Sequence, residues 1–390
     1  MFPVVLPTYA RADVAFEKGE GAYLWSTDGR RFLDFGSGVA VTSLGHCHPH
    51  LVKALTEQAG KLWHTSNLYR VPGQETVAKL LVERTFADTV FFCNSGAEAN
   101  EAAIKMARKF HYERGDKNRH RIICATGAFH GRTLATIAAG GQEKHLKGFD
   151  PVVEGFDHVP FGNLNALRAA ITPETAAILV EPVQGEGGIV PGDPDYLKRL
   201  RATADEFGLL LIFDEVQTGM GRTGRLFAHE HAGVTPDIMP VAKGLGGGFP
   251  VGACLATAEA ASGMTAGTHG STFGGNPLAM AAAQAVIEVM TTPGFLDRAE
   301  ATGRKLRAGL EEVCGRFPAA IEEVRGLGMM IGLKCRIPNT ELSARLLANG
   351  LLTVGAGDNV VRMLPPLIIG EAEIGEALDI LARTLSEVTS

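Results

Sequence analysis

The sequence lacks the features that mark several classes of protein. No apolar run approaches the roughly 18 residues that a membrane span needs. Met1-Phe2-Pro3 is not followed by the basic and apolar segments of a secretory signal. A net charge of −6 gives no sign of nucleic acid or anionic membrane as a partner, and repeats and low-complexity tracts are missing. We therefore expect a cytoplasmic globular protein whose partners are small molecules.

Cysteines are few and form no recognisable framework. None belongs to a CxxC pair and four lie within apolar segments, so we expect small buried hydrophobes in a reducing cytosol rather than disulfides. The six are Cys47, Cys93, Cys124, Cys254, Cys314 and Cys335.

One of these cysteines lies in the loop Gly45-His46-Cys47-His48-Pro49-His50, which suggests a metal site. Zinc-type sites use spaced pairs of ligands, whereas these side chains are crowded together without distant ligands. We predict no bound metal.

Two short apolar runs that end in charged residues dominate the middle of the chain. Leu209–Phe213 ends in Asp214, and Ile238–Ala242 ends in Lys243, followed by the glycines of 244–248. Each run has the length and composition of a buried parallel strand. Ligands of such sheets bind just outside the carboxyl ends of the strands. The sequence therefore predicts an acid and an amine at one sheet edge, 243 − 214 = 29 residues apart.

An isolated pair of this kind would be a strand cap and a solvated lysine. Here the glycines pack backbone closely around Lys243, and partial burial of an amine lowers its pKa and makes it a nucleophile toward carbonyls. Pyridoxal phosphate needs this pair, a lysine for its aldehyde and an aspartate for its pyridine nitrogen. A dinucleotide site at 244–248 is excluded because the glycine spacing is wrong and no acidic residue follows about 20 positions later.

Motifs across almost the whole chain match one enzyme family in order. They are LGHCHP at 44–49, HTSN at 64–67, NSGAEANEAAIK at 94–105, FHGRT at 129–133, EPVQGEGG at 181–188, FDEVQTGMGRTG at 213–224, AKG at 242–244, STFGGNP at 271–277 and VRMLPP at 361–366. With these motifs the chain resembles the class III (subgroup II) aminotransferases of fold type I. Within that class the resemblance is closest to members that act on N2-acetyl-L-ornithine.

Strand–helix alternation from about residue 88 to 256 indicates an α/β fold with right-handed crossovers. The resemblance implies the pyridoxal-phosphate-dependent transferase fold type I, with a mainly parallel seven-stranded sheet in a large domain and a smaller α+β domain. We expect residues 1–50, an extended arm and a hairpin, to be part of the small domain. Residues 51–275 would form the large domain and 276–390 the rest of the small one.

The turn before the predicted helix at 98–112 offers free N–H groups and a positive dipole end, which suit a phosphate. Alone, the turn would be an ordinary N-cap. The resemblance implies phosphate binding by Ser95, Gly96 and Ala97, although many relatives have threonine at the last position. It further implies that Thr272 binds the phosphate of a neighbouring subunit.

The remaining cofactor contacts are also implied by the resemblance. Phe129 and Val216 would lie on opposite faces of the pyridine ring, and Gln217 would bond its phenolic oxygen. Asp214 would pair with the ring nitrogen. Lys243 would carry the cofactor and move the substrate proton.

For substrates, the resemblance assigns Arg132 to a distal carboxylate and Arg362 to the α-carboxylate of glutamate. Guanidinium groups pair bidentately with carboxylates. Glu186 would mask Arg362 while an ω-amine donor is bound, and Ser271 and Tyr9 would lie near the substrate. We count Lys243, Asp214 and Glu186 as the catalytic set.

The expected activity is that of a homodimeric aminotransferase using N2-acetyl-L-ornithine and 2-oxoglutarate, in arginine biosynthesis. Ornithine, succinylornithine, succinyldiaminopimelate and 4-aminobutyrate stay open as alternative donors. Ornithine-specific relatives have tyrosine where this chain has Val39, which argues against free ornithine. Racemases or aminomutases of this fold fit the Glu186 and Arg362 pair less well. A non-catalytic binding protein is disfavoured because both Lys243 and Asp214 are present.

Overall fold

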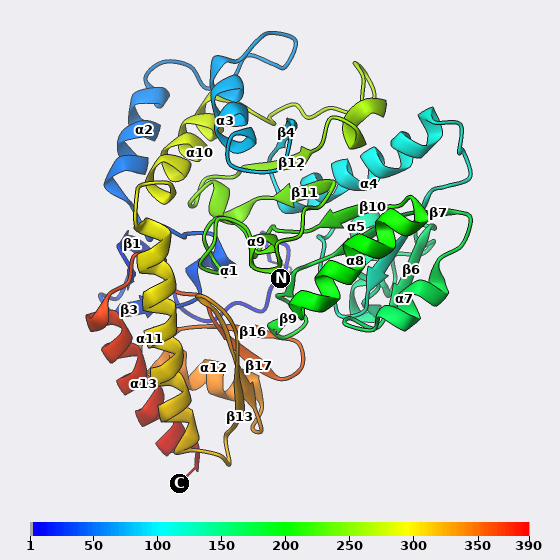
Figure 1. The fold of residues 1–390 in the computed structure, drawn as a ribbon. Helices are drawn as coiled ribbons and strands as arrows, with labels where there is room; N and C mark the ends of the chain where they lie inside the picture. Colours follow the sequence, from blue (N-terminus) through cyan, green and yellow to red (C-terminus); the bar gives the residue numbers. More distant parts are fainter. Residues whose placement is uncertain (1–2, 390) are drawn as a thin grey trace.

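A seven-stranded sheet forms the centre of the molecule in the computed structural model, which describes residues 3–389 (Figure 1). The spatial order is β4-β12-β11-β10-β7-β5-β6. The strands are β4 (Thr89–Cys93), β5 (Arg121–Ala125), β6 (Phe156–Val159), β7 (Thr175–Val180), β10 (Leu210–Phe213), β11 (Ile238–Val241) and β12 (Gly252–Ala256). Only β12 runs antiparallel to its neighbours in this sheet. The predicted α/β fold with a mainly parallel seven-stranded sheet is confirmed.

Helices cover both faces of this sheet, because its central strands are apolar on both sides. Ile122, Leu179 and Ile212 pack in one cluster with apolar residues of α4 (Gly96–Glu113). Their neighbours Ile123, Ile178 and Leu211 pack in a second cluster with α8 (Pro194–Phe207). This alternation follows from the two-residue period of a strand. The other helices of this region are α2 (Pro49–Ala59), α3 (Pro72–Val82), α5 (Leu134–Gly140), α6 (Glu143–Leu146), α7 (Leu164–Ala170), α9 (His229–Ala232) and α10 (Pro277–Met290).

The second region combines an antiparallel sheet with long helices below the main sheet (Figure 1). Its sheet order is β13-β14-β17-β16. The elements are α11 (Phe295–Gly315), β13 (Ile321–Leu327), β14 (Met330–Cys335), α12 (Asn339–Ala348), β15 (Leu351–Leu352), β16 (Val354–Ala356), β17 (Val360–Met363) and α13 (Glu371–Thr389). Short elements elsewhere are α1 (Ser37–Ala40), β8 (Val183–Gln184), β9 (Val190–Pro191), η1 (Lys243–Leu245) and η2 (Ala260–Gly263).

The N-terminal segment joins this second region through a sheet of its own. The predicted hairpin is present as β2 (Tyr23–Ser26) and β3 (Arg31–Asp34), and β15 pairs parallel with β3. The expected N-terminal arm also contains a strand that we did not predict, because β1 (Phe16–Glu20) pairs with β2. Its sequence FEKGE has no apolar alternation that would predict a strand. The β3–β15 pairing supports our proposal that residues 1–50 belong with the C-terminal region. The proposed boundary between 51–275 and 276–390 assigns α10 to that region, whereas α10 packs mainly on α2 and α3.

Within residues 3–389, no single helix has the length and apolar character to cross a membrane. Helices α10 and α11 are long and apolar enough only when they are taken together, and they meet at an angle of 73°.

Arg222 links the two regions through a buried guanidinium group. It is 1% exposed, and its Nη1 donates to the carbonyl oxygens of Met329 at 3.1 Å and Pro365 at 2.6 Å. No carboxylate is bonded to it among the described residues, and burial lowers its pKa to about 9. The large region therefore holds the small one through a buried cation that is bonded to carbonyl oxygens, with the negative charge of Asp34 opposing the effect of burial on its pKa.

We predict that Arg222→Ala lowers the free energy of unfolding by about 3 kcal/mol, because it leaves a cavity and two unsatisfied carbonyl groups. Denaturant unfolding monitored by circular dichroism measures the effect. The exposed Arg225 is the matched control, and Arg225→Ala should change stability by less than about 0.5 kcal/mol. Equal effects of the two substitutions would contradict the linking role.

Candidate active site

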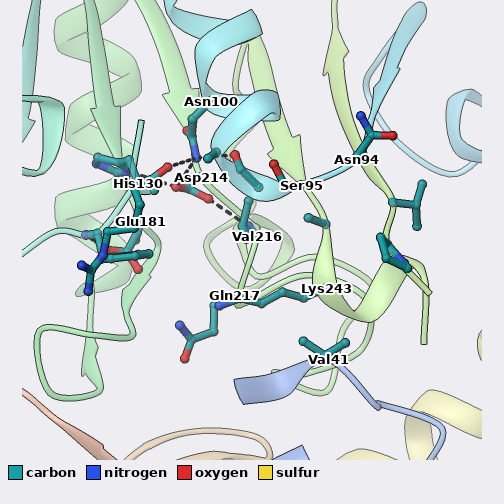
Figure 2. Close-up of a pocket in the computed structure, with 18 of the residues that line it drawn as sticks. Val41, Asn94, Ser95, Asn100, His130, Glu181, Asp214, Val216, Gln217 and Lys243 are labelled. Carbon is teal, nitrogen blue, oxygen red and sulfur yellow. Dashed lines mark hydrogen bonds and ion pairs between the residues drawn. The ribbon is translucent and has the colours of Figure 1, made fainter. Parts of the chain in front are cut away.

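A cavity of about 420 Å³ lies at the carboxyl ends of β10 and β11 and contains both residues of the predicted acid–amine pair (Figure 2). Its walls come from the turn before α4, the loop after β5 and the segments after β10 and β11. The lining residues are Val41, Asn94, Ser95, Gly96, Ala97, Asn100, Phe129, His130, Gly131, Arg132, Glu181, Asp214, Val216, Gln217, Ala242, Lys243 and 248–251. Nine predicted site residues therefore lie around one space.

Asp214 is a buried carboxylate held by three neighbours. It follows β10, is 3% exposed, and accepts hydrogen bonds from Asn100 Nδ2 at 2.8 Å and the Val216 N–H at 3.0 Å. His130 Nδ1 lies 2.8 Å from the same oxygen that Asn100 contacts (Figure 2). A buried charge is tolerated only with such partners, so the orientation of Asp214 is fixed from three elements.

Asn100 and His130 were missed by the sequence analysis. Burial lowers the pKa of His130, but the hydrogen bond and the negative charge of Asp214 outweigh this and raise it. A signal was present for each. Asn100 is a polar residue on the buried, alanine-rich side of α4, and His130 lies inside the FHGRT motif. Neither pattern alone identifies an aspartate partner 114 or 84 residues away.

Lys243 begins the short helix η1 with φ of 47°, a backbone conformation that is uncommon for a residue with a side chain. Its neighbour Gly244 leaves no room for a side chain, since an added Cβ would lie 2.9 Å from Ser43 Oγ. The Lys243 pKa is lowered, chiefly by burial and also by Arg362, against the opposing effect of Glu186. Closely packed backbone thus presents an amine with increased neutral fraction to the cavity.

The turn Ser95–Ala97, which we predict to hold a phosphate, directly precedes the body of α4. Ser95 Oγ caps α4 by accepting the Glu98 N–H at 3.2 Å. The first N–H groups of a helix have no intrahelical acceptor, so those of Gly96 and Ala97 are suited to an anion. A Cβ on Gly96 would lie 2.6 Å from Val216 Cγ1, so only glycine brings the turn this close.

Phe129 and Val216 both line the cavity, as the ring-face prediction requires. Arg132 is exposed and its guanidinium carbon lies 5.5 Å from the centre of the Phe129 ring. Gln217 is buried against Gly185, where an added Cβ would lie 2.3 Å from Gln217 Nε2.

Arg362 and Glu186 form an ion pair beside the cavity. Arg362 Nη1 lies 2.6 Å from Glu186 Oε1 and donates also to Gln217 Oε1 at 3.1 Å. Its Nη2 donates to the Gly355 carbonyl oxygen at 2.9 Å. The side chain of Arg362 is 2% exposed and that of Glu186 is 28% exposed, so the arginine is fixed and the glutamate is the partner with access to solvent.

Besides Glu186 and Arg362, three predicted residues do not line this cavity in the single chain. Tyr9 is 75% exposed on the N-terminal arm. Ser271 and Thr272 line a separate cavity of about 470 Å³, where Ser271 Oγ accepts from Asn94 Nδ2 at 3.1 Å. The structure of one chain therefore does not bring these three to Lys243.

The histidine-rich loop is bound to another part of the fold through one of its histidines. His46 Nε2 lies 2.8 Å from Asp34 Oδ2, and Cys47 is exposed. Across residues 3–389, no group of three His, Cys, Asp or Glu side chains has the arrangement of a metal site.

Glu181 is a further buried carboxyl that the sequence analysis missed. It is 4% exposed, and its two oxygens accept the N–H groups of Phe129 and Gly185, each at 3.0 Å. It thereby joins the loop that carries the Phe129 ring to the loop that carries Glu186. Burial raises its pKa to about 7, with Asp214 acting in the same direction and His130 in the opposite one.

This raised pKa predicts how stability depends on pH. Glu181 favours its neutral form more in the folded than in the unfolded chain, so its contribution is fully present below pH 4.5 and is lost as pH rises through about 7. Between pH 5 and 8, Glu181→Gln should therefore gain stability relative to the wild type, by about 2 kcal/mol. Urea unfolding at both pH values measures this change, with the exposed Glu174→Gln as control. A pH-independent difference would show that Glu181 does not titrate in this window.

The cavity fits pyridoxal 5′-phosphate by the chemistry of its groups. A phosphate would meet the N–H groups before α4, a pyridine ring would lie between Phe129 and Val216, and its nitrogen would face a buried carboxylate. Lys243 supplies the amine for the aldehyde. Gly96, which has no side chain, lets the turn before α4 lie close to Val216.

Comparison with known proteins agrees with this chemistry. The family Aminotransferase class-III matches residues 7–385. An acetylornithine aminotransferase from Mesorhizobium japonicum is 61% identical over 95% of this chain and 93% of its own. The one from Rhodobacter capsulatus is 57% identical over 99% of each.

Solved structures are similar over the same length. The ornithine aminotransferase of Toxoplasma gondii has a TM-score of 0.95 and 35% identity, covering 99% of this chain and 93% of that one. The N-acetylornithine aminotransferase of Stenotrophomonas maltophilia has a TM-score of 0.86 and 38% identity, covering 98% of each. The chain therefore belongs to the class III aminotransferases, enzymes of fold type I that use pyridoxal 5′-phosphate.

Proposed function

We propose that this enzyme transfers the terminal amino group of N2-acetyl-L-ornithine to 2-oxoglutarate, giving N-acetyl-L-glutamate 5-semialdehyde and L-glutamate. This is a step of arginine biosynthesis, and we place it in the cytoplasm. The observation that carries the proposal is the Glu186–Arg362 pair beside the Lys243 cavity. Relatives that are named acetylornithine aminotransferases, at 57–61% identity over at least 95% of the chain, support it.

When bound, the cofactor supplies an aldehyde and a ring that accepts electrons from the substrate carbon. Lys243 provides the amine that holds the cofactor and, once released, the base that moves the proton of that carbon. Its lowered pKa increases the neutral fraction that both tasks need. Asp214, oriented by Asn100 and His130, keeps a negative charge where the ring nitrogen would lie.

Two different donors must use this one site. Acetylornithine presents a terminal amine, whereas glutamate presents an amine beside a carboxylate. Arg362, masked by Glu186, offers no charge to the first donor, and Arg362 freed from Glu186 binds the α-carboxylate of the second. Arg132, exposed at the cavity wall, takes the distal carboxylate in both cases.

A screen of amino donors in the first half-reaction tests the proposal. Acetylornithine should remove the absorption band of the cofactor-bound enzyme faster than succinylornithine, succinyldiaminopimelate, ornithine or 4-aminobutyrate. Lys243→Ala should slow this step by roughly a thousandfold while phosphate binding persists. Faster reaction with another donor would reassign the substrate. Full activity of Lys243→Ala would show that Lys243 is neither the amine that holds the cofactor nor the base.

The ion pair gives the sharpest test of how one site accepts both donors. Glu186→Ala should slow the acetylornithine half-reaction about 10- to 100-fold, because an unmasked arginine draws that substrate in by its carboxylate. It should spare the glutamate half-reaction. Arg362→Ala should do the reverse, and Arg132→Ala should harm both.

Single-turnover absorbance measures the two half-reactions separately. Glu186→Gln keeps the size of the side chain and removes its charge, so it distinguishes masking from packing. Equal losses in both halves for Glu186→Ala would show that Glu186 is only structural.

We propose that the enzyme is a homodimer in which Thr272 and Ser271 complete the neighbouring site. In their own chain they line a neighbouring cavity rather than the Lys243 cavity, and this supports the arrangement. Mixing Thr272→Ala with Lys243→Ala chains should restore activity, because the hybrid contains one undamaged site and one doubly damaged site. No recovery in hybrids whose formation is verified by native mass spectrometry would mean that Thr272 acts within its own chain.

A further inference from the structure

A second cavity lies along the C-terminal half of α4, and Lys243 does not line it. It has a volume of about 360 Å³ and shares no lining residue with the active-site cavity. Its walls are the C-terminal half of α4, the loop between α4 and β5, and the segment around residues 264–268 that follows η2. We call it the basic groove.

The lining of the groove is strongly cationic. Six residues carry or can carry positive charge, and no lining residue is acidic. They are Lys105, Arg108, Lys109, Lys117, Arg119 and His120. The first three follow the helical spacing that places side chains on one face of α4. In a chain with a net charge of −6, this concentration of one sign is unusual.

Most of these cations are positioned without being neutralised. Arg108 donates to the carbonyl oxygens of His120 and Glu154, and Arg119 to those of Thr175 and Phe207. Lys105 Nζ donates to the Thr268 carbonyl oxygen at 2.9 Å. Carbonyl groups fix a cation in place but cancel only part of its charge.

Lys109 is an exception, because it forms an ion pair with the carboxylate of Glu113. The negative dipole end of α4 also attracts cations, which accounts for charges at this end of the helix. It does not account for a hollow between them. Burial lowers the pKa of Arg108, although Glu101 acts in the opposite direction, so its positive charge is poorly compensated.

An aromatic ring lies among the cations. Tyr112 is 48% exposed, with the ammonium groups of Lys109 and Lys117 at 5.0 and 5.2 Å from its ring centre. Exposed aromatic rings are platforms for flat ligands, and basic side chains around them suit phosphate. The volume lies within the usual range of small-molecule sites, about 300 to 1,000 Å³.

We propose that the basic groove binds a small polyphosphate that carries an aromatic base, such as a nucleoside diphosphate or triphosphate. The phosphates contact Lys105, Arg108 and Lys117, and the base stacks on Tyr112. Binding at this site is independent of the amino donor that the active site accepts.

The test uses the enzyme saturated with pyridoxal phosphate and isothermal titration with ATP. Binding should saturate and weaken with added salt, because phosphate contacts are screened. Tripolyphosphate, which lacks the base, should bind at least about tenfold more weakly, the free-energy scale of one stacking contact. Adenosine, which lacks phosphate, should not bind measurably.

Variants locate the ligand. The double substitution Lys105→Gln with Lys117→Gln should weaken ATP binding at least about tenfold. Tyr112→Ala should remove the preference for ATP over tripolyphosphate, while Tyr112→Phe keeps it. Lys198→Gln on α8, an exposed lysine across the sheet, is the matched control and should change nothing.

Several results would overturn the proposal. Absence of saturable binding would do so, including the case in which a second chain covers the groove. An equal loss for Lys198→Gln would mean nonspecific attraction. ATP binding that disappears as pyridoxal phosphate occupies Lys243 would place the anion in the active site. Tighter binding of a single-stranded oligonucleotide than of ATP would mean that the groove binds a nucleic acid rather than a small molecule.

Discussion

The buried charge of Asp214 is the constraint on which the rest of the site depends. Taking a carboxylate out of water is costly unless hydrogen bonds replace its hydration. Here the replacements come from Asn100 on α4, His130 in the loop after β5, and the backbone of Val216 after β10. One charge therefore fixes the relative positions of three elements. The same elements carry the phosphate turn, the Phe129 ring and the opposite ring face.

Glu181 extends this constraint to the substrate side. Its oxygens accept the N–H groups of Phe129 and Gly185. The same buried carboxyl group therefore holds the loop that carries Phe129 and the loop that carries Glu186. Two carboxyl groups and one histidine then occupy a nearly dry volume, and their ionisation is interdependent. Burial is the main cause of the raised pKa of Glu181, whereas burial lowers the pKa of His130 and the bond to Asp214 raises it.

Much of the fold could be predicted from the sequence because its signals are local. Strands β4 and β5 coincide with apolar runs of the sequence, and helix α8 lies between Pro194 and Gly208. Lys243 and Asp214 were found because each ends an apolar run. Strand β1 was missed because its polar sequence is determined by pairing with β2 rather than by burial.

The missed residues share a different cause. Asn100, His130 and Glu181 act through partners far away in the sequence, and no local pattern specifies such contacts. The resemblance supplied Ser271, Thr272 and Tyr9, but a single chain leaves them away from the cavity. In the homodimer that we propose, Ser271 and Thr272 act on the site of the neighbouring subunit, which a single chain does not contain.

Gln217 connects the cofactor side of the site to its substrate side. Its Oε1 accepts from Arg362, which leaves Nε2 as the donor available to a ring oxygen. Gly185 allows no other close packing, because any side chain there would collide with this amide. Arg362 has three partners, Glu186, Gln217 and the Gly355 carbonyl oxygen, so the exchange of Glu186 for a substrate carboxylate that we propose would need to change only one of them. Leaving the arginine with no carboxylate would cost several kcal/mol. For the exchange that we propose, the incoming carboxylate would therefore displace Glu186 directly, and the partial exposure of Glu186 beside a buried arginine supports such an exchange.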